Sequence, residues 1–242
     1  KGGDGKHVYN STQLLSLSTL PKRLVIIGGG YISLEFACMF QAFGSKVTIL
    51  EASDTFLARE DRDVADEMLH ILNSRGIEVK LNAKTTELQE NDSYTTVITS
   101  QGNFDAEAVL VAIGRKPATD ELELHNAEIK TDERGYIITN DYLQVCDHIW
   151  AMGDVAKTPQ FTYMSLDDYR IVRDQLFGDS KRNRLDRKNI ATSVFTYPTL
   201  AQVGLTEQQA KAAELQFEVK KIAANSIPKA KILGQTDGLL KA

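Results

Sequence analysis

A glycine-rich segment, Gly28-x-Gly30-x-x-Ser33, has the residue types and spacing to bind a phosphate group. It follows the short apolar run Leu24–Ile27 and precedes a segment of helical period, Tyr31–Phe43. Gly28 permits a tight turn, and Gly30 lets a pyrophosphate approach amides at a helix N-terminus, where the helix dipole favours negative charge. Ser33 replaces a third glycine that packs helix against strand, and serine is small enough to do so. The segment predicts a dinucleotide-binding turn, and the alternative is a glycine turn that serves packing alone.

An acidic residue, Glu51, ends the next predicted strand, Lys46–Leu50, about 20 positions after the glycines. A carboxylate there accepts hydrogen bonds from the ribose hydroxyls of adenosine and repels a 2′-phosphate. The residues Ala52-Ser53-Asp54 offer no arginine to neutralise such a phosphate, although Arg59 lies in the next loop. NADH is therefore favoured over NADPH. The alternative for Glu51 is a solvated carboxylate at a strand end.

The elements that position these residues follow from hydrophobic periodicity. Leu24–Ile27 and Lys46–Leu50 have the apolar composition of strands buried on both faces of a parallel sheet. Farther along the chain, apolar and polar residues alternate with a period of two, which predicts an antiparallel β-meander. Further elements are predicted as a helix at Asp61–Ser74, strands at Ile77–Leu81, Thr85–Leu88, Tyr94–Thr99 and Phe104–Ala112, and an apolar strand over Val109–Ile113.

A second candidate site is Trp150-Ala151-Met152-Gly153-Asp154-Val155. A buried strand, predicted over His148–Met152, ends there in a Gly-Asp pair that can offer a carboxylate to a sugar alcohol. The commoner explanation of such a pair is a strand-to-loop turn. Other elements are predicted as a short strand at Ile137-Ile138, a helix over Phe161–Leu176, a boundary near Asn189, strands at Ser193–Phe195, Gln202–Gly204 and Phe217–Val219, and a helix opening at Thr206-Glu207.

Composition and charge exclude several classes of function. The chain has 242 residues and a formal net charge of −5. Hydrophobic residues make up 42% of it, which is ordinary for a soluble globular protein. This mildly acidic charge does not indicate binding to nucleic acid or to an anionic membrane. No apolar run approaches the roughly 20 residues of a membrane helix. We therefore expect a cytoplasmic protein. Cys38 and Cys146 form no CxxC pair and the four histidines have no ligand spacing, so neither a disulfide framework nor a metal site is predicted.

Four motifs occur in one order along the chain, and together they resemble a known family. They are Val25–Ala37 with its glycines, Ala112-Ile113-Gly114-Arg115-Lys116-Pro117, Ala151-Met152-Gly153-Asp154-Val155, and Val194-Phe195-Thr196-Tyr197-Pro198 running to Val203-Gly204-Leu205-Thr206-Glu207. This order is similar to that of the class I pyridine nucleotide-disulfide oxidoreductases, such as glutathione reductase, dihydrolipoamide dehydrogenase and mercuric reductase. Within the family, Pro159–Val172 most resembles the reactive-chlorine-resistance reductases, bacterial flavoproteins linked to reduction of hypothiocyanous acid. Without the family, Asp167-Asp168 would be a solvated helix face.

The resemblance implies an α/β fold. It consists of a Rossmann-type parallel sheet with a β-meander as the NAD(P) domain, part of the FAD or central domain, and the start of an α+β dimer-interface domain. The implied divisions are the tail of the FAD domain at residues 1–17, the NAD(P) domain at 18–116, the central segment at 117–189 and the truncated dimerisation domain at 190–242.

The resemblance also implies residue roles. Tyr31 matches a tyrosine that lies over the flavin and moves aside for nicotinamide, and Glu35 matches a glutamate that contacts the nicotinamide end and pairs with a lysine of the FAD domain. Asp154 matches an aspartate that binds the ribityl chain of FAD. Tyr31 and Glu35 share one helical face, and their simpler alternatives are a packing ring and a surface carboxylate. The predicted cofactor-binding set is Gly28, Gly30, Tyr31, Ile32, Ser33, Glu51, Gly114, Asp154, Gln160, Phe161 and Thr162.

In the implied enzyme, a homodimer, hydride passes from NAD(P)H to FAD and then to a redox disulfide, which reduces a small-molecule oxidant or disulfide substrate. The family carries a second glycine turn and a CxxxxC pair upstream, and a His-x-x-x-x-Glu pair downstream. This sequence contains none of them. We therefore expect a fragment that binds NADH and is inactive as a disulfide reductase.

Three alternatives remain open at this stage. One is a disulfide-free flavoprotein of the same layout, such as a soluble transhydrogenase, which an upstream CxxxxC pair would exclude. Another is a non-catalytic dinucleotide-binding module, in which Asp154 would have no purpose. The third is an ordinary Rossmann dehydrogenase, which the meander and Gly153-Asp154 disfavour because neither supplies a Tyr-Lys or His-Asp catalytic set.

Overall fold

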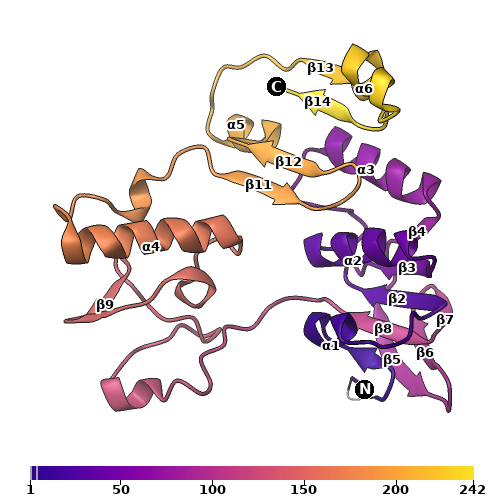
Figure 1. The fold of residues 1–242 in the computed structure, drawn as a ribbon, viewed down its shortest axis with the longest axis horizontal. Helices are drawn as coiled ribbons and strands as arrows, with labels where there is room; N and C mark the ends of the chain where they lie inside the picture. The colour runs from indigo at the N-terminus through magenta and orange to yellow at the C-terminus, as the bar shows by residue number, and fades with distance from the viewer. Residues whose placement is uncertain (1, 4) are drawn as a thin grey trace. The chain divides into compact units, whose positions relative to one another are not determined.

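The computed structural model describes residues 2–3 and 5–242, and the chain divides into two compact units. Unit 1 comprises residues 1–113 and 193–242, and unit 2 comprises residues 114–192. Figure 1 shows the elements of each unit along the chain.

A five-stranded parallel sheet forms the centre of unit 1, in the order β1-β8-β2-β3-β4. Its strands are β1 (Val8–Tyr9), β2 (Arg23–Ile27), β3 (Lys46–Leu50), β4 (Ile77–Lys80) and β8 (Ala108–Val111). The chain leaves β2 toward β3 on one side, and β8 returns on the other side of β2. The strand order therefore reverses at β2 and β8, and ligands of open parallel sheets bind at the carboxyl ends of strands at such a point.

Side-chain alternation along the strands gives the sheet two apolar faces. Leu24 and Ile26 of β2 face the larger core cluster, which includes buried residues of α2 (Tyr31–Ala42) and α3 (Arg62–Ser74). Figure 1 shows both helices on one side of the strands β2, β3 and β4. The short helix α1 (Ser11–Leu15), capped by the Asn10 side chain, adds Leu14 to the same cluster.

The other face of the sheet packs against an antiparallel meander of β5 (Thr85–Glu90), β6 (Thr95–Thr99) and β7 (Gly102–Ala106). Val25 and Val109 of the sheet pack there with Val97 and Ala106 of the meander. The predicted parallel sheet with a β-meander is thus confirmed.

The prediction of one strand over Phe104–Ala112 was wrong. β7 and β8 belong to different sheets, and the chain passes from one to the other at Glu107, whose carboxylate accepts a hydrogen bond from the backbone of Lys22 at 2.7 Å. The apolar strand also ends earlier than predicted, at Val111, and Ile113 is exposed.

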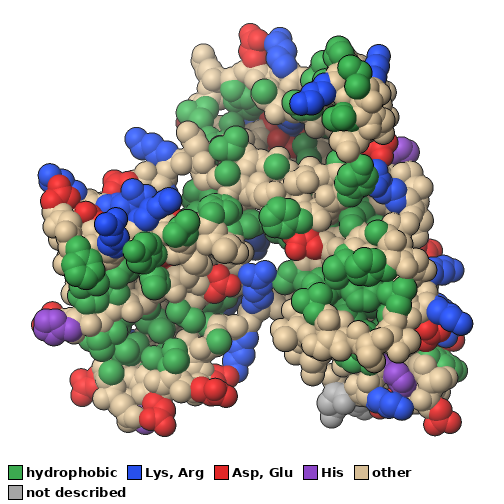
Figure 2. Space-filling view, viewed as in Figure 1, with side chains coloured by type: hydrophobic (Ala, Val, Ile, Leu, Met, Phe, Trp, Pro, Cys, Tyr) green, Lys and Arg blue, Asp and Glu red, His purple; other side chains and the backbone are tan. Residues whose placement is uncertain are grey.

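The C-terminal elements of unit 1 are short. They are β11 (Ala191–Val194), whose first two residues belong to unit 2, β12 (Leu200–Val203), α5 (Glu207–Ala212), β13 (Lys221–Ala223), η4 (Ala224–Ser226), α6 (Pro228–Leu233) and β14 (Leu239–Lys241). Thr206 caps α5 in a capping box with Gln209, as its position before a helix predicts. The strand predicted at Phe217–Val219 was wrong, because pairing with β14 places the strand at Lys221–Ala223. Figure 2 shows hydrophobic and basic side chains side by side around α6.

Unit 2 is built around α4 (Thr162–Phe177) and a small hairpin. Its other elements are η1 (Leu124–Ala127), β9 (Gln144–Cys146), β10 (Ile149–Trp150), η2 (Gly153–Ala156) and η3 (Arg184–Asp186). Leu143 and Ile171 lie at the centre of its core. The strand predicted over His148–Met152 is shorter, because β10 shifts register at Trp150. Ile137 forms one isolated bridge with Thr131 rather than a strand.

In the part of the chain that the structure describes, there is no helix long and apolar enough to cross a membrane.

Candidate functional site

The glycine turn, Gly28–Gly30, joins the carboxyl end of β2 to the N-terminus of α2. Gly28 has a φ of +102°, and a Cβ atom at this position would lie 2.6 Å from the carbonyl oxygen of Ala112. Only glycine avoids both the left-handed strain and this contact. Glycine is therefore required in the predicted tight turn at Gly28, because the chain here runs close to the residue that follows β8.

Glu51 lies directly against the glycine turn. Its Oε2 accepts a hydrogen bond from the backbone nitrogen of Gly29 at 2.6 Å, and its Oε1 accepts one from Ser53 at 2.8 Å. A Cβ atom on Gly29 would lie 2.7 Å from the same Oε2, so a side chain at this position would displace the Glu51 carboxylate. The structure thus brings together the two features that the sequence places 22 positions apart.

Gly30 caps α2 with extended backbone, no side-chain hydrogen bond, and open space where a Cβ would stand. The first amides of a helix have no partner within it, so this end of α2 can bind an anion. Ser33 is fully buried one turn along, and its Oγ has no hydrogen-bond partner among the described residues. Ile32 is half-buried and packs against the larger core cluster.

Tyr31 begins α2, and its hydroxyl donates a hydrogen bond to Oε1 of Glu60. Burial raises the pKa of the Tyr31 phenol, and the hydrogen bond and charge of Glu60 raise it further, so the phenol stays protonated. Glu60 is buried in the loop between β3 and α3. The sequence analysis did not identify Glu60, since no motif or period marks it.

Glu35 lies one helical turn after Tyr31, and its Oε1 accepts a hydrogen bond from the backbone nitrogen of Phe195 at 2.9 Å. The carboxylate therefore has a partner within unit 1. Its predicted contacts with nicotinamide and with a lysine of another domain stay predictions.

In unit 2, the aspartate turn, Gly153-Asp154, begins the short helix η2. Asp154 is partly exposed, and one of its oxygens lies 3.3 Å from Nη1 of Arg115. The same nitrogen lies 3.4 Å from the carbonyl oxygen of Gln160, so Arg115 joins two predicted site residues. Gly114, which precedes Arg115, is exposed with a φ of +144°.

The start of α4 holds the other predicted residues of unit 2. Phe161 caps the helix and its ring stacks on Tyr163 at a centroid distance of 5.6 Å, while Thr162 is the first helical residue. The side-chain amide of Gln160 donates to the hydroxyl of Tyr136 at 3.3 Å. Of these residues, Gln160 is linked to Asp154 through Arg115.

Asp168 anchors the aspartate turn and was missed by the sequence analysis. Its Oδ2 accepts hydrogen bonds from the nitrogen of Gly153 at 2.6 Å and from the hydroxyl of Thr158 at 2.7 Å, and its Oδ1 pairs with Arg187. The expectation of a solvated face at Asp167-Asp168 was wrong, because Asp168 is fully buried. Its position four residues after Met164 and three before Ile171, both buried, is the signal that marks this carboxylate as inward-facing.

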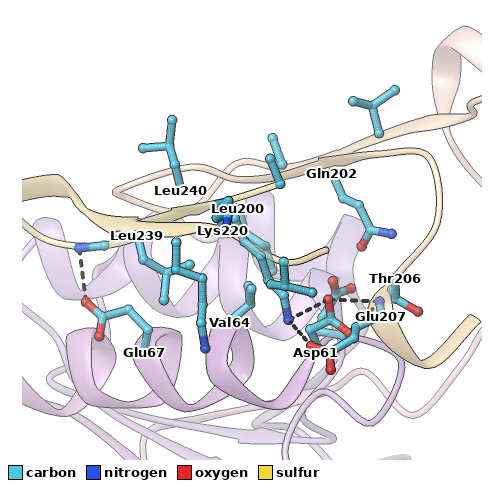
Figure 3. A pocket seen from close by; sticks show the side chains of 18 of the residues that line it. Asp61, Val64, Glu67, Leu200, Gln202, Thr206, Glu207, Lys220, Leu239 and Leu240 are labelled. Atoms are coloured by element: carbon cyan, nitrogen blue, oxygen red, sulfur yellow. Dashed lines mark hydrogen bonds and ion pairs between the residues drawn. The ribbon is translucent and has the colours of Figure 1, made fainter. Parts of the chain in front are cut away.

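A separate cleft of about 800 Å³ lies between α3 and the C-terminal strands of unit 1 (Figure 3). At one end, Nζ of Lys241 lies 2.9 to 3.0 Å from carboxylate oxygens of Asp61, Asp63 and Glu207. Burial acts to raise the pKa of Asp63, but hydrogen bonds from Lys221 and Lys241 outweigh it and lower the pKa to about 2. These charges attach the β13–β14 hairpin to α3.

The described residues contain no cluster of three or more His, Cys, Asp or Glu side chains that could hold a metal ion. Cys38 is half-buried, Cys146 is exposed, and neither forms a disulfide.

Comparison with known families gives two matches. The family described as "Pyridine nucleotide-disulphide oxidoreductase" matches residues 1–168, and the dimerisation domain of the same family matches residues 190–242.

Individual proteins are similar over nearly the whole chain. "Probable pyridine nucleotide-disulfide oxidoreductase RclA" of Escherichia coli is 48% identical over 97% of this chain, which spans 54% of that protein. A mercuric reductase of Staphylococcus aureus is 34% identical over 96% of the chain and 43% of its own length. The solved structure of the "HOCl-induced flavoprotein disulfide reductase RclA" from Escherichia coli covers 98% of this chain with a TM-score of 0.94 and 47% identity, and 55% of that protein is covered. The chain thus spans about half the length of these relatives.

Proposed function

Since this chain belongs to the pyridine nucleotide-disulphide oxidoreductase family, we propose that the protein of which it is a part is an NAD(P)H- and FAD-dependent oxidoreductase. It passes hydride from nicotinamide to flavin and then to a redox disulfide. Residues 18–116 form its NAD(P) domain, residues 117–189 complete its FAD domain after the segment at 1–17, and residues 190–242 begin its dimerisation domain. The protein is a homodimer, and its final acceptor is a disulfide or another small oxidant.

The main support for the dinucleotide site is the contact between Glu51 and the glycine turn. The distance from Oε2 of Glu51 to the nitrogen of Gly29 is 2.6 Å. It places a carboxylate beside an uncapped helix N-terminus at the point where the strand order reverses. The open space at Gly30 admits a pyrophosphate, and the α2 amides donate to it. The residues present therefore fit a dinucleotide.

Glu51 also sets the preference between the two nicotinamide dinucleotides. Each oxygen of its carboxylate accepts one backbone amide, and each oxygen has a further lone pair for a ribose hydroxyl. A 2′-phosphate at the same place would meet this negative charge, so NADH binds more tightly than NADPH. Arg59 is exposed in the following loop.

Unit 2 contributes part of a flavin site. When bound, FAD accepts hydride from the nicotinamide and passes the electrons on to a disulfide. Asp154 would accept hydrogen bonds from the ribityl hydroxyls, with Arg115 holding that carboxylate in place. Gln160, Phe161 and Thr162 would lie beside the ring, and Gly114 would leave room for the cofactor at the start of unit 2.

Tyr31 and Glu35 act at the nicotinamide end. Both lie on the first two turns of α2, after the glycine turn and on the same helical face. Tyr31 would lie between nicotinamide and flavin and control access to the flavin, and Glu35 would contact the nicotinamide end of the dinucleotide. Residues 1–242 alone bind NADH without disulfide reductase activity, since the chain holds only Cys38 and Cys146, which are not a redox pair.

Calorimetric titration of the chain with NADH and NADPH tests this proposal. We expect NADH to bind about tenfold more tightly, equivalent to about 1.4 kcal/mol. Glu51→Gln removes the repulsion of a 2′-phosphate and should reduce this ratio toward one. Glu121→Gln, which removes the same charge from an exposed position in unit 2, is the matched control and should leave the ratio unchanged.

Equal affinities for the two dinucleotides in the unaltered chain would contradict the role of Glu51. Failure of both to bind would contradict the dinucleotide site itself. Disulfide reduction by the chain alone, with NADH and added FAD, would contradict the proposal that residues 1–242 bind NADH without disulfide reductase activity.

A further inference from the structure

We propose that Asp168 is a positioning residue of the flavin site, an inference that rests on the function proposed above. Its buried carboxylate holds the turn at residues 153–158 at both ends, and Asp154, the proposed ligand of the ribityl chain, lies within that turn. Asp168 does not touch the cofactor and acts on flavin binding through Asp154.

One oxygen atom of Asp168 contacts both ends of the turn. Oδ2 accepts a hydrogen bond from the backbone nitrogen of Gly153 at 2.6 Å and another from the hydroxyl of Thr158 at 2.7 Å. Gly153 and Thr158 are both buried, and a buried donor that loses its acceptor is costly. The turn can therefore leave α4 only by giving up two hydrogen bonds together.

The turn also lies close to α4 beside this contact. Gly153 has a φ of +75°, and a Cβ atom at this position would lie 3.0 Å from Oγ of Ser165. Ser165 and Asp168 are three residues apart on α4, so they share the face of the helix that meets the turn. Within the turn, the nitrogen of Lys157 donates to the oxygen of Asp154 at 3.1 Å. These contacts fix the backbone from which the Asp154 side chain extends.

Asp168 itself is held by an ion pair. Its other oxygen pairs with Arg187, and Asp168 is fully buried while the Arg187 side chain is 11% exposed. Arg187 also pairs with Asp167 at 2.8 Å. A buried carboxylate that has its cation and its hydrogen-bond donors in place is costly to move, because each lost contact leaves a polar group unpaired. The position of Asp168 is therefore well defined before any ligand binds.

The Asp154 side chain has weaker restraints of its own. It is 44% exposed, and its partner Arg115, which is 41% exposed, lies at 3.3 Å. An ion pair this exposed contributes little by itself to fixing a side chain. The direction of the Asp154 carboxylate thus depends on the backbone of the turn, and so on Asp168. A carboxylate that is oriented before binding loses less conformational freedom when the ribityl hydroxyls arrive, which favours FAD affinity.

The test is FAD binding by the full-length protein of which this chain is a part. The apoprotein is titrated with FAD, and the change in flavin fluorescence gives the dissociation constant. Two variants form a matched pair, because both lack the ion pair and they differ only in the acceptor for the turn. Asp168→Ala with Arg187→Met removes the acceptor and should weaken FAD binding about tenfold. Asp168→Asn with Arg187→Met keeps an amide oxygen as acceptor and should stay within about twofold of the unaltered protein.

Dependence on Asp154 separates positioning from a general loss of structure. In an Asp154→Ala background, the same two variants should differ in FAD affinity by less than about twofold, because the carboxylate that the turn positions is gone. Asp167→Asn is the control on the same helix. It removes one negative charge from the neighbouring residue, whose partners are Arg182 and Arg187, and it should leave FAD affinity unchanged.

Thr158→Val removes one of the two hydrogen bonds with little change of shape, so it tests the proposal even where Asp168→Ala does not fold. We expect the affinity for FAD to fall about threefold. In residues 1–242 alone, hydrogen exchange at the amide of Gly153 should be faster in Asp168→Ala with Arg187→Met than in Asp168→Asn with Arg187→Met.

Three outcomes overturn the role of Asp168. They are an unchanged FAD affinity in Thr158→Val, equal affinities in the matched pair, and a difference within that pair that persists in full in the Asp154→Ala background. Each of these leaves the proposed function standing, because FAD still binds. An unaltered full-length protein that binds no FAD overturns the proposed function and this inference with it.

Discussion

Two turns of this chain, one in each unit, place a carboxylate against the backbone amide of a glycine. In unit 1 the nitrogen of Gly29 donates to Glu51, and in unit 2 the nitrogen of Gly153 donates to Asp168, both at 2.6 Å. The hydrogen-bond distance is the same, but the surroundings of the two carboxylates differ. Glu51 is partly exposed at the end of a strand, whereas Asp168 is fully buried on a helix and paired with Arg187.

This difference shows what each carboxylate is able to do. A buried charge must be compensated within the protein, and Arg187, Thr158 and Gly153 together provide that compensation for Asp168. Its oxygens are therefore committed to the fold. Glu51 keeps contact with solvent, so it can accept further hydrogen bonds from a ligand without losing those to the turn. The same amide contact thus supports a binding group in one unit and a structural anchor in the other.

The largest expected effect comes from Arg187→Met, which leaves Asp168 buried without its cation. We expect it to reduce the free energy of unfolding of unit 2 by about 3–5 kcal/mol. Urea unfolding followed by the fluorescence of Trp150, the only tryptophan and a residue of unit 2, measures this change. Arg182→Met is the control, because Arg182 pairs with Asp167 from an exposed position and should contribute less than about 1 kcal/mol. Equal losses in the two variants would contradict the role of Asp168 as a buried structural anchor, and with it the proposed difference from Glu51.

A smaller effect is expected from acid. Burial acts to raise the pKa of Asp167, but hydrogen bonds from Arg187 and Arg182 outweigh it and hold the pKa below its usual value of 3.8. A carboxyl with a depressed pKa in the folded state contributes stability that is present above its ordinary pKa and is lost as the pH falls toward the folded-state value. The urea concentration at the unfolding midpoint, reported by Trp150, should therefore decrease as the pH is lowered below about 4. Asp167→Asn should flatten this dependence, and an unchanged slope in that variant would contradict the ion network.

The smallest effect on stability is expected from Glu51→Gln. An amide oxygen can still accept a hydrogen bond from Gly29, and the site is partly solvated, so the free energy of unfolding should change by less than about 1 kcal/mol. Hydrogen exchange at the amides of Gly29 and Ser53 measures the local effect. A loss as large as that of Arg187→Met would mean that Glu51 is a structural anchor as well.

Periodicity and motif spacing predicted most of unit 1. The apolar runs over β2 and β3, the glycines between them and the meander all have short-range signals, because alternation and turn residues report local geometry. Strand pairing has no such signal. The strand at Lys221–Ala223 was placed four residues too early, and β7 and β8 were joined, because their partners lie elsewhere in the chain.

The candidate site was predictable to the same extent. Residues in motifs were found, and the structure brings Gly29 and Glu51 into contact. Glu60, Asp168 and Arg187 were missed because their roles come from tertiary contacts across 15 to 29 positions. Of these, only Asp168 has a local signal, its place on the buried stripe of α4.

The passage of Gly28 beside the carbonyl of Ala112 also bears on the order in which the molecule is assembled. During synthesis on the ribosome, β2, α2 and β3 emerge before the meander, while β8, the other neighbour of β2, emerges only after the whole meander. The glycine turn therefore reaches its final surroundings late, after a long loop has closed. Until then β2 has one open edge, which a nascent chain must keep from pairing with other strands.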